Sequence, residues 1–113
     1  VGPYTRTNFP NMTFQELDAV KVKGKNEPVS IYAPIGEVNQ LDGSVVDALE
    51  KWRDMLQAFR TQNWLLARTL LNEIENSVVV NPILRSLYEH RMDYLEANPP
   101  PESWDGVTQF DTK

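Results

Sequence analysis

Residues 14–35 read FQELDAVKVKGKNEPVSIYAPI, and this stretch decides the first part of the fold. Valine alternates with lysine over residues 20–23, and apolar residues alternate again over residues 29–35. A period of two is typical of a β-strand with one solvated face. Between the two runs, Gly-Lys-Asn at residues 24–26 is a typical turn sequence. The stretch therefore predicts a β-hairpin.

The first strand of this hairpin changes phase near Asp18. Phe14 falls on the same face as Val20, whereas Leu17 falls on the opposite face. A β-bulge or bend near Asp18 would reconcile them, and the alternative is that both faces are covered. Because a lone two-stranded hairpin is marginal in water, we expect it to pair with a second chain or to fold onto the helices.

Residues 44–97 carry apolar residues three and four positions apart, the spacing of helices that bury one face. The pattern breaks at residues 61–63 and again before Asn81, so three helices are expected. Connections this short make neighbouring helices antiparallel. The expected apolar stripes consist of Val45, Ala48, Leu49, Trp52, Met55, Leu56 and Phe59, then Trp64, Ala67, Leu70, Leu71 and Ile74, then Leu84, Leu87, Tyr88, Arg91 and Leu95.

The expected helix ends rest on local capping patterns. Ser44, three residues before Asp47, resembles a capping box at the start of the first helix. Asn81-Pro82 supplies an N-cap and a proline at the first helical position of the third. Pro99 should end that helix at or before the preceding asparagine.

The C-terminal residues 99–113 begin with three prolines and are expected to be extended. Trp104, Val107 and Phe110 are the expected anchors of this tail onto the helices. The predicted fold class is therefore α+β: an N-terminal β-hairpin, three antiparallel helices and an extended, proline-rich tail. We expect the hairpin to occupy residues 1–36 and the helical extension to occupy residues 37–113.

Composition excludes several classes of protein. The chain has 113 residues, 41% of them hydrophobic, enough for one modest core. It contains no cysteine, which excludes a disulfide scaffold and a thiolate metal site. A net charge of −5 argues against nucleic-acid binding by the whole surface, and the chain lacks an apolar run of membrane-spanning length.

The remaining polar and aromatic residues have ordinary structural explanations. His90 has no second histidine with which to share a metal, so a surface position on a helix is expected. The acidic residues at 73 and 75, and at 89, 93 and 96, fit a solvated face with local pairs such as Glu89 with Arg85. Trp52, Phe59 and Trp64 could line a peptide groove, but so regular a stripe favours a core.

Several strings of the chain resemble one enzyme family. Residues 14–18 (FQELD), 20–25 (VKVKGK) and 27–32 (EPVSIY) resemble the closing strands of class III adenylate/guanylate cyclase catalytic domains. Residues 99–107 (PPPESWDGV) resemble the closing motif of membrane-anchored bacterial cyclases that carry an extracellular CHASE2 sensor. Between these strings, Phe59, Trp64 and Ala67 are similar to one tetratricopeptide-type helix pair.

The resemblance implies a parent enzyme that makes cyclic AMP from ATP, with release of pyrophosphate, in signal transduction. Such an enzyme uses Mg²⁺ or Mn²⁺, and the family's two metal-binding aspartates and its Asn-x-x-x-Arg pair precede the matched segment. The chain itself is therefore expected to contain no catalytic and no metal-binding residue. Lys23 resembles the lysine that contacts the triphosphate, a role that suits a point charge beside a turn glycine.

The same resemblance implies the chain's surroundings. The expected partners are the upstream catalytic domain and a second copy in a homodimer, with ATP bound by the parent and no nucleic acid or direct membrane contact. The expected location is the cytoplasmic portion of a membrane-anchored protein. The alternative hypothesis is an interaction module without enzymatic role, in which tetratricopeptide-like helices bind a peptide or helix and the hairpin is a pedestal.

Overall fold

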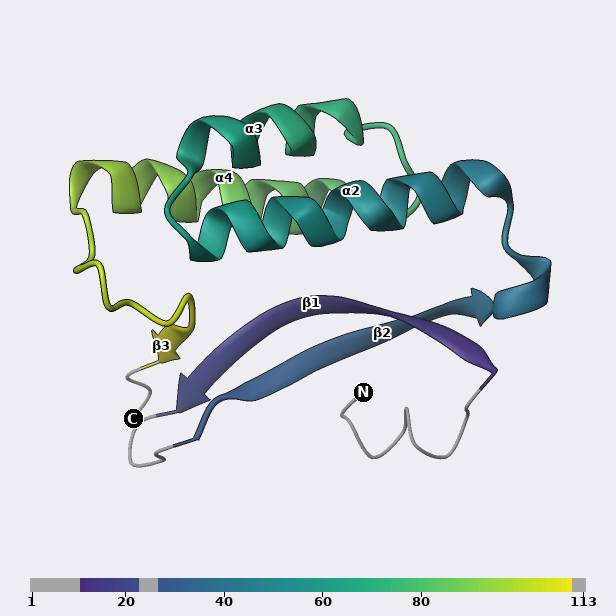
Figure 1. The fold of residues 1–113 in the computed structure, drawn as a ribbon, viewed down its shortest axis with the longest axis horizontal. Coiled ribbons are helices and arrows are strands. Elements are labelled where there is room, and N and C mark those ends of the chain that lie inside the picture. Colours follow the sequence, from purple (N-terminus) through teal and green to yellow (C-terminus); the bar gives the residue numbers. More distant parts are fainter. Residues whose placement is uncertain (1–10, 23–26, 111–113) are drawn as a thin grey trace. The chain divides into compact units, whose positions relative to one another are not determined.

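The computed structural model describes residues 11–22 and 27–110 and shows an α+β architecture (Figure 1). A two-stranded antiparallel hairpin is followed by three helices, which confirms the predicted order. No helix in these ranges is long and apolar enough to cross a membrane. In chain order the elements are β1 (Met12–Val22), β2 (Val29–Glu37), the short 3-10 helix η1 (Val38–Gln40), α2 (Gly43–Arg60), α3 (Trp64–Glu73), α4 (Pro82–Ala97) and β3 (Thr108–Phe110).

The described residues divide into two compact units. The strand unit contains the described residues up to 41 together with residues 106–110, and the helical unit contains residues 42–105. The chain therefore passes from strands to helices once and returns to the strands after α4. Residues 106–110 belong with the strands, whereas the sequence had suggested a helical extension running from residue 37 to the end.

The strand unit is a three-stranded sheet in the order β2-β1-β3. Strands β1 and β2 are antiparallel, with Val20 opposite Val29. Glu16 lies opposite Tyr32 and Asp18 opposite Ile31, so one extra residue, Leu17, interrupts the register. This irregularity confirms the bulge predicted near Asp18, and it accounts for the change of phase along β1.

The tail contains a strand that the sequence analysis did not predict. Residues 108–110 form β3, which pairs in parallel with Val20–Val22 of β1. The hairpin thus gains a partner from its own chain, a possibility that the sequence analysis did not consider. Contact of Val107 and Phe110 with the helices stays a prediction. Pairing of the hairpin with a second chain, or its folding onto the helices, stays a prediction.

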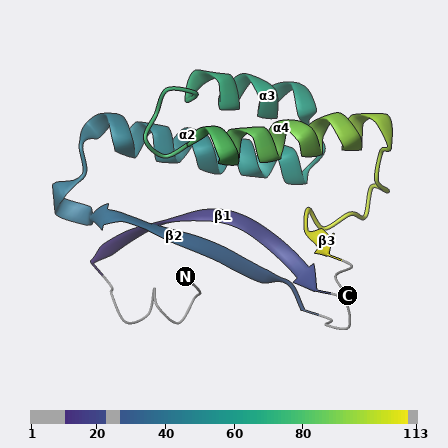
Figure 2. The ribbon, with the colours of Figure 1, turned by 180° about the vertical axis from the view of Figure 1, so that it is seen from behind.

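The helical unit packs around aromatic side chains and methionines. The rings of Trp52 and Tyr88 meet edge to face with centroids 5.4 Å apart, and this pair joins α2 to α4. Met92, absent from the predicted stripe, is fully buried on α4. The three helices lie alongside one another from both viewing directions (Figures 1 and 2). Most predicted stripe residues are buried, namely Ala48, Leu49, Trp52, Met55, Leu56, Phe59, Ala67, Leu71, Ile74, Leu84 and Tyr88.

The helix ends confirm one capping prediction and correct another. The side chain of Asn81 accepts a hydrogen bond from the Leu84 amide at 2.8 Å, as expected for an N-cap. The capping box at Ser44 is wrong, because α2 begins at Gly43 and its N-cap is Asp42. The Ser44 hydroxyl instead donates to the Asp42 carboxylate at 2.9 Å, so neither side chain caps the helix.

This difference between the two N-caps predicts unequal losses of stability. Asn81→Ala should lower the free energy of unfolding by about 1 kcal/mol, because the Leu84 amide loses its acceptor. Asp42→Ala is the matched control and should cost less than about 0.5 kcal/mol, because its side chain makes no capping bond. Urea unfolding of both variants measures the difference, and an equal or larger loss for the Asp42 variant would contradict the assignment.

Candidate functional site

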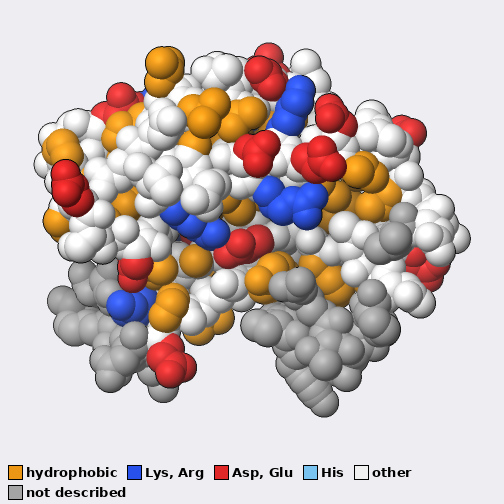
Figure 3. Space-filling model, in the orientation of Figure 1, with side chains coloured by type: hydrophobic (Ala, Val, Ile, Leu, Met, Phe, Trp, Pro, Cys, Tyr) orange, Lys and Arg blue, Asp and Glu red, His pale blue; other side chains and the backbone are white. Residues whose placement is uncertain are grey.

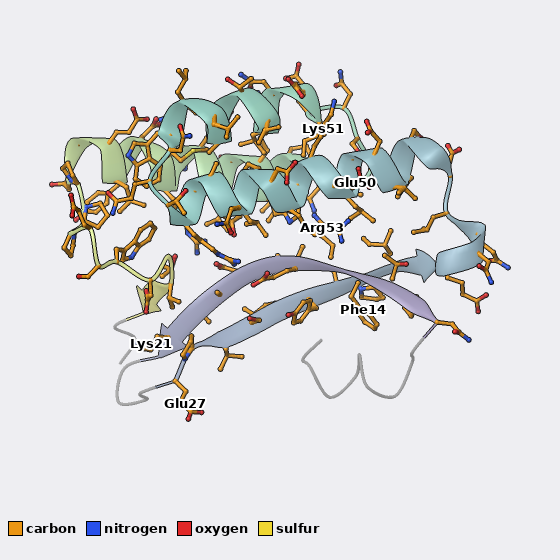
Figure 4. All side chains as sticks on the ribbon, viewed as in Figure 1. Phe14, Lys21, Glu27, Glu50, Lys51 and Arg53 are labelled. Atoms are coloured by element: carbon orange, nitrogen blue, oxygen red, sulfur yellow. The ribbon has the colours of Figure 1, made fainter. Side chains whose placement is uncertain are left out.

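The end of the hairpin is the place to which the cyclase resemblance assigns a function. Lys21, near the end of β1, is half-buried, and Glu27, before β2, is exposed. Figure 4 shows both residues at the end of the hairpin where the two strands connect. Lys23, the expected phosphate-binding residue, lies outside the described residues, and so does Lys25.

The end of β1, which precedes Lys23 in the sequence, pairs with a strand on each side. On one side β2 pairs with β1 as far as Val20, and on the other side β3 pairs with β1 as far as Val22. Lys23 is the next residue in the sequence after Val22. The last paired residue of β1 is thus flanked by the C-terminal strand and precedes the lysine directly.

The connection between α2 and α3 has a recognisable hydrogen-bond pattern. The amide of Asn63 donates to the carbonyl of Ala58 at 2.8 Å, and the amide of Gln62 donates to that of Phe59 at 3.1 Å. These bonds form a Schellman motif, whose left-handed position glycine usually occupies. Here Gln62 occupies it with φ 65°, and its side-chain Nε2 donates to the carbonyl oxygen of Pro101 at 2.9 Å.

The structure confirms Trp104 as an anchor of the tail on the helices. Its ring packs edge to face on Phe59 with centroids 5.6 Å apart, and it lies tilted against Trp64 at 6.2 Å. Phe59 also meets Trp64 and Tyr88 edge to face. Trp64 and Trp104 therefore cover one end of the helical core instead of lining an open peptide groove.

The acidic residues singled out in the sequence are engaged by arginines. Arg68 of α3 donates to Asp93 at 2.8 Å and to Glu96 at 2.8 Å, both on α4. These hydrogen bonds, with that to Asp93 the larger cause, raise the pKa of the Arg68 guanidinium. Arg85 donates to Glu75 and, as predicted, to Glu89. Figure 3 shows acidic and basic side chains interspersed over the exposed surface.

A shallow hollow of about 440 Å³ lies between the start of α2 and the segment after α3. Lys51 reaches from α2 towards α3 in Figure 4 and forms ion pairs with Asp47 at 3.8 Å and Glu73 at 3.3 Å. The hollow is open and its charges are paired within the helical unit. Nothing in this arrangement resembles an acid–base pair set apart for catalysis.

The described residues do not fit a divalent metal site. Residues 11–22 and 27–110 include no group of three or more His, Asp or Glu side chains that could hold an ion. His90 lies exposed on α4, as expected from its isolation in the sequence.

Comparison with protein-family models, with curated proteins and with solved structures found no match for the chain.

The sequence alone did not single out two residues that the structure makes notable, Gln62 and Gly106. Gln62 lies in the break at residues 61–63, but only its φ value and its bond to Pro101 single it out. Gly106 has a φ of 79° and lies two residues before the start of β3 at Thr108. The Asp-Gly pair at residues 105–106 was the available signal, since this pair is typical of turns.

The arginine–carboxylate cluster at Arg68 should behave as a surface ion pair. Arg68→Gln should lower the free energy of unfolding by less than about 1 kcal/mol, because solvent screens partly exposed charges. The loss should shrink further between low and high salt in urea unfolding experiments. A large loss that does not depend on salt would show instead that the charges are desolvated and structurally essential.

Proposed function

We propose that the chain is the C-terminal part of a class III nucleotidyl cyclase, containing the last hairpin of the catalytic domain and a helical extension. The observation that carries the proposal is the run of residues 14–32, whose cyclase-like strings coincide with β1, its connection and β2. The tail supports it independently, because the cyclase-like residues 99–107 lead directly into β3.

In this proposal Lys23 contributes to nucleotide binding in the intact enzyme. The connection between β1 and β2 carries Lys23 and Lys25 around Gly24, so it brings positive charge to one end of a hairpin. An ammonium group suits the phosphate chain of a nucleoside triphosphate, and a glycine permits close approach of the backbone. The reaction itself requires groups that the described residues do not supply, so the isolated chain is proposed to be inactive.

A second candidate is a protein-interaction module built on tetratricopeptide-like helices. The observation in its favour is an exposed apolar stripe along α4. Ile83 and Tyr94 have exposed fractions of 83% and 66%, and Leu87, at 38%, lies between them. Their separations of four and seven residues place all three side chains on one side of the helix. Such a stripe is typical of a surface that accepts another helix.

The proposal predicts a specific defect for Lys23→Ala in the protein that includes the preceding domain. The KM for ATP should rise roughly ten- to a hundredfold with little change in kcat, because the lost contact is with the unreacted phosphates. Cyclic nucleotide formation would be measured with Mg²⁺ or Mn²⁺, using ATP and separately GTP.

Lys21→Ala is the matched control, because Lys21 lies on the same strand but has no role assigned by the resemblance. Its KM should equal that of the unchanged protein. Full activity in the Lys23 variant would make Lys23 an ordinary surface lysine. Absence of activity with both nucleotides, in a folded protein, would favour the interaction module.

A further inference from the structure

A four-residue turn of the tail lies against the connection between α2 and α3. The amide of Trp104 donates to the carbonyl oxygen of Pro101 at 3.0 Å, which closes a β-turn over residues 101–104. The same oxygen accepts the side-chain hydrogen bond of Gln62 at 2.9 Å. These residues all belong to the helical unit, residues 42–105. One oxygen atom therefore closes the turn and holds it to the helices.

The tryptophan of this turn occupies an aromatic site on the helical unit. Its ring meets Phe59 edge to face with centroids 5.6 Å apart, and it lies tilted against Trp64 at 6.2 Å. Phe59 is buried, whereas Trp64 and Trp104 are partly exposed. Phe59 also packs edge to face on Tyr88, a contact that does not involve the tail. The site thus lies at the surface of the unit, and its floor is held by the core.

Both groups that the helices contact lie within four consecutive residues. The carbonyl oxygen comes from the first residue of the turn, and the ring comes from the fourth. The hydrogen bond that shapes the turn is internal to the same segment. Three prolines at residues 99–101 restrict the backbone and so lower the entropy lost when the segment is ordered. A short free peptide can therefore present the same groups in the same arrangement.

Gln62 is an independent sign that the contact is specific. Its φ of 65° places it at the left-handed position of the Schellman motif, which glycine fills without steric cost. Glutamine at this position adds a side-chain donor, and that donor reaches Pro101. Because water competes for such a bond, its net contribution to affinity is modest. The amide therefore fixes the orientation of the turn, while the aromatic contacts supply most of the binding.

We propose that Phe59, Gln62 and Trp64 form a recognition site for a peptide in which a tryptophan follows a proline by three residues. The chain's own tail occupies this site, and its natural competitor is a partner protein that presents a Pro-x-x-Trp turn. Because the tail is tethered, it competes at an effective concentration on the order of millimolar. A partner therefore binds when the tail is displaced. The proposal concerns the helical unit alone and does not rest on the cyclase hypothesis.

Binding of a synthetic peptide to the 113-residue chain tests the site by NMR. The peptide has the sequence of residues 99–105 (PPPESWD), and the isotope-labelled chain carries Trp104→Ala, which removes the competing ring. The side-chain amide signals of Gln62 and the indole signal of Trp64 should shift and saturate as peptide is added. A peptide with alanine in place of the tryptophan should bind at least tenfold more weakly. The unchanged chain should likewise need at least tenfold more peptide, because its own tail competes.

Two further variants in the Trp104→Ala background separate the contacts. Gln62→Gly keeps the left-handed backbone but removes the donor, so it should weaken peptide binding several-fold. Ile83→Ala is the matched control, since it removes an exposed apolar side chain at the start of α4 and should leave the affinity unchanged. An equal loss in both variants would place the peptide elsewhere on the helices and overturn the assignment.

Circular dichroism checks that the helices remain folded in each variant. Where Trp104→Ala unfolds them, Trp104→Leu takes its place, because leucine keeps an apolar side chain beside Phe59. The absence of shifts at Gln62 and Trp64 with millimolar peptide, in a folded variant, would overturn the proposal. Equal binding of the peptide that lacks tryptophan would do the same. Cyclase activity does not enter the experiment, so this proposal and the proposed function can fail separately.

Discussion

The packing of Phe59 is the interaction on which the helical unit most depends. This residue is buried in the last turn of α2, and its ring contacts Trp64 at the start of α3, Tyr88 in the middle of α4 and Trp104 in the tail. Each edge-to-face contact contributes about 0.5–1.5 kcal/mol beyond the burial of area. One side chain thus joins α2, α3 and α4 to Trp104 of the tail, so the packing of these three helices and the anchoring of the tail depend on the same ring.

Most of the fold was accessible from the sequence because it depends on local periodicity. The alternation in residues 14–35 predicted the hairpin, and the conflict between Phe14 and Leu17 located the bulge. Helical spacing predicted the three helices, and Asn81 was identified as an N-cap because its side chain can act only on the adjacent turn. These features are set by residues close together in the chain, where backbone geometry limits the choices.

The features that the sequence did not predict arise from long-range contacts. Strand β3 has only three residues, too few for a period to be recognised, and its partner β1 lies more than eighty residues earlier. The Ser44–Asp47 pair matched a capping box, but α2 begins at Gly43 with Asp42 as its N-cap. The hydroxyl of Ser44 instead donates a hydrogen bond to the carboxylate of Asp42. The residues of interest show the same division. Lys23 is proposed from a local sequence motif, whereas Gln62 became notable only through its φ value and its contact with Pro101.

The central claim is that this hairpin is the last part of a cyclase catalytic domain. The claim is tested upstream of Val1, where the rest of that domain would be encoded. The most direct measurement is to determine the coding sequence immediately upstream. The account predicts two metal-binding aspartates and an Asn-x-x-x-Arg pair within about 150 residues, roughly the length of one domain. An upstream sequence composed of further helical repeats, without these groups, would contradict the claim and support an interaction protein, since about three such repeats are needed to bury a continuous core.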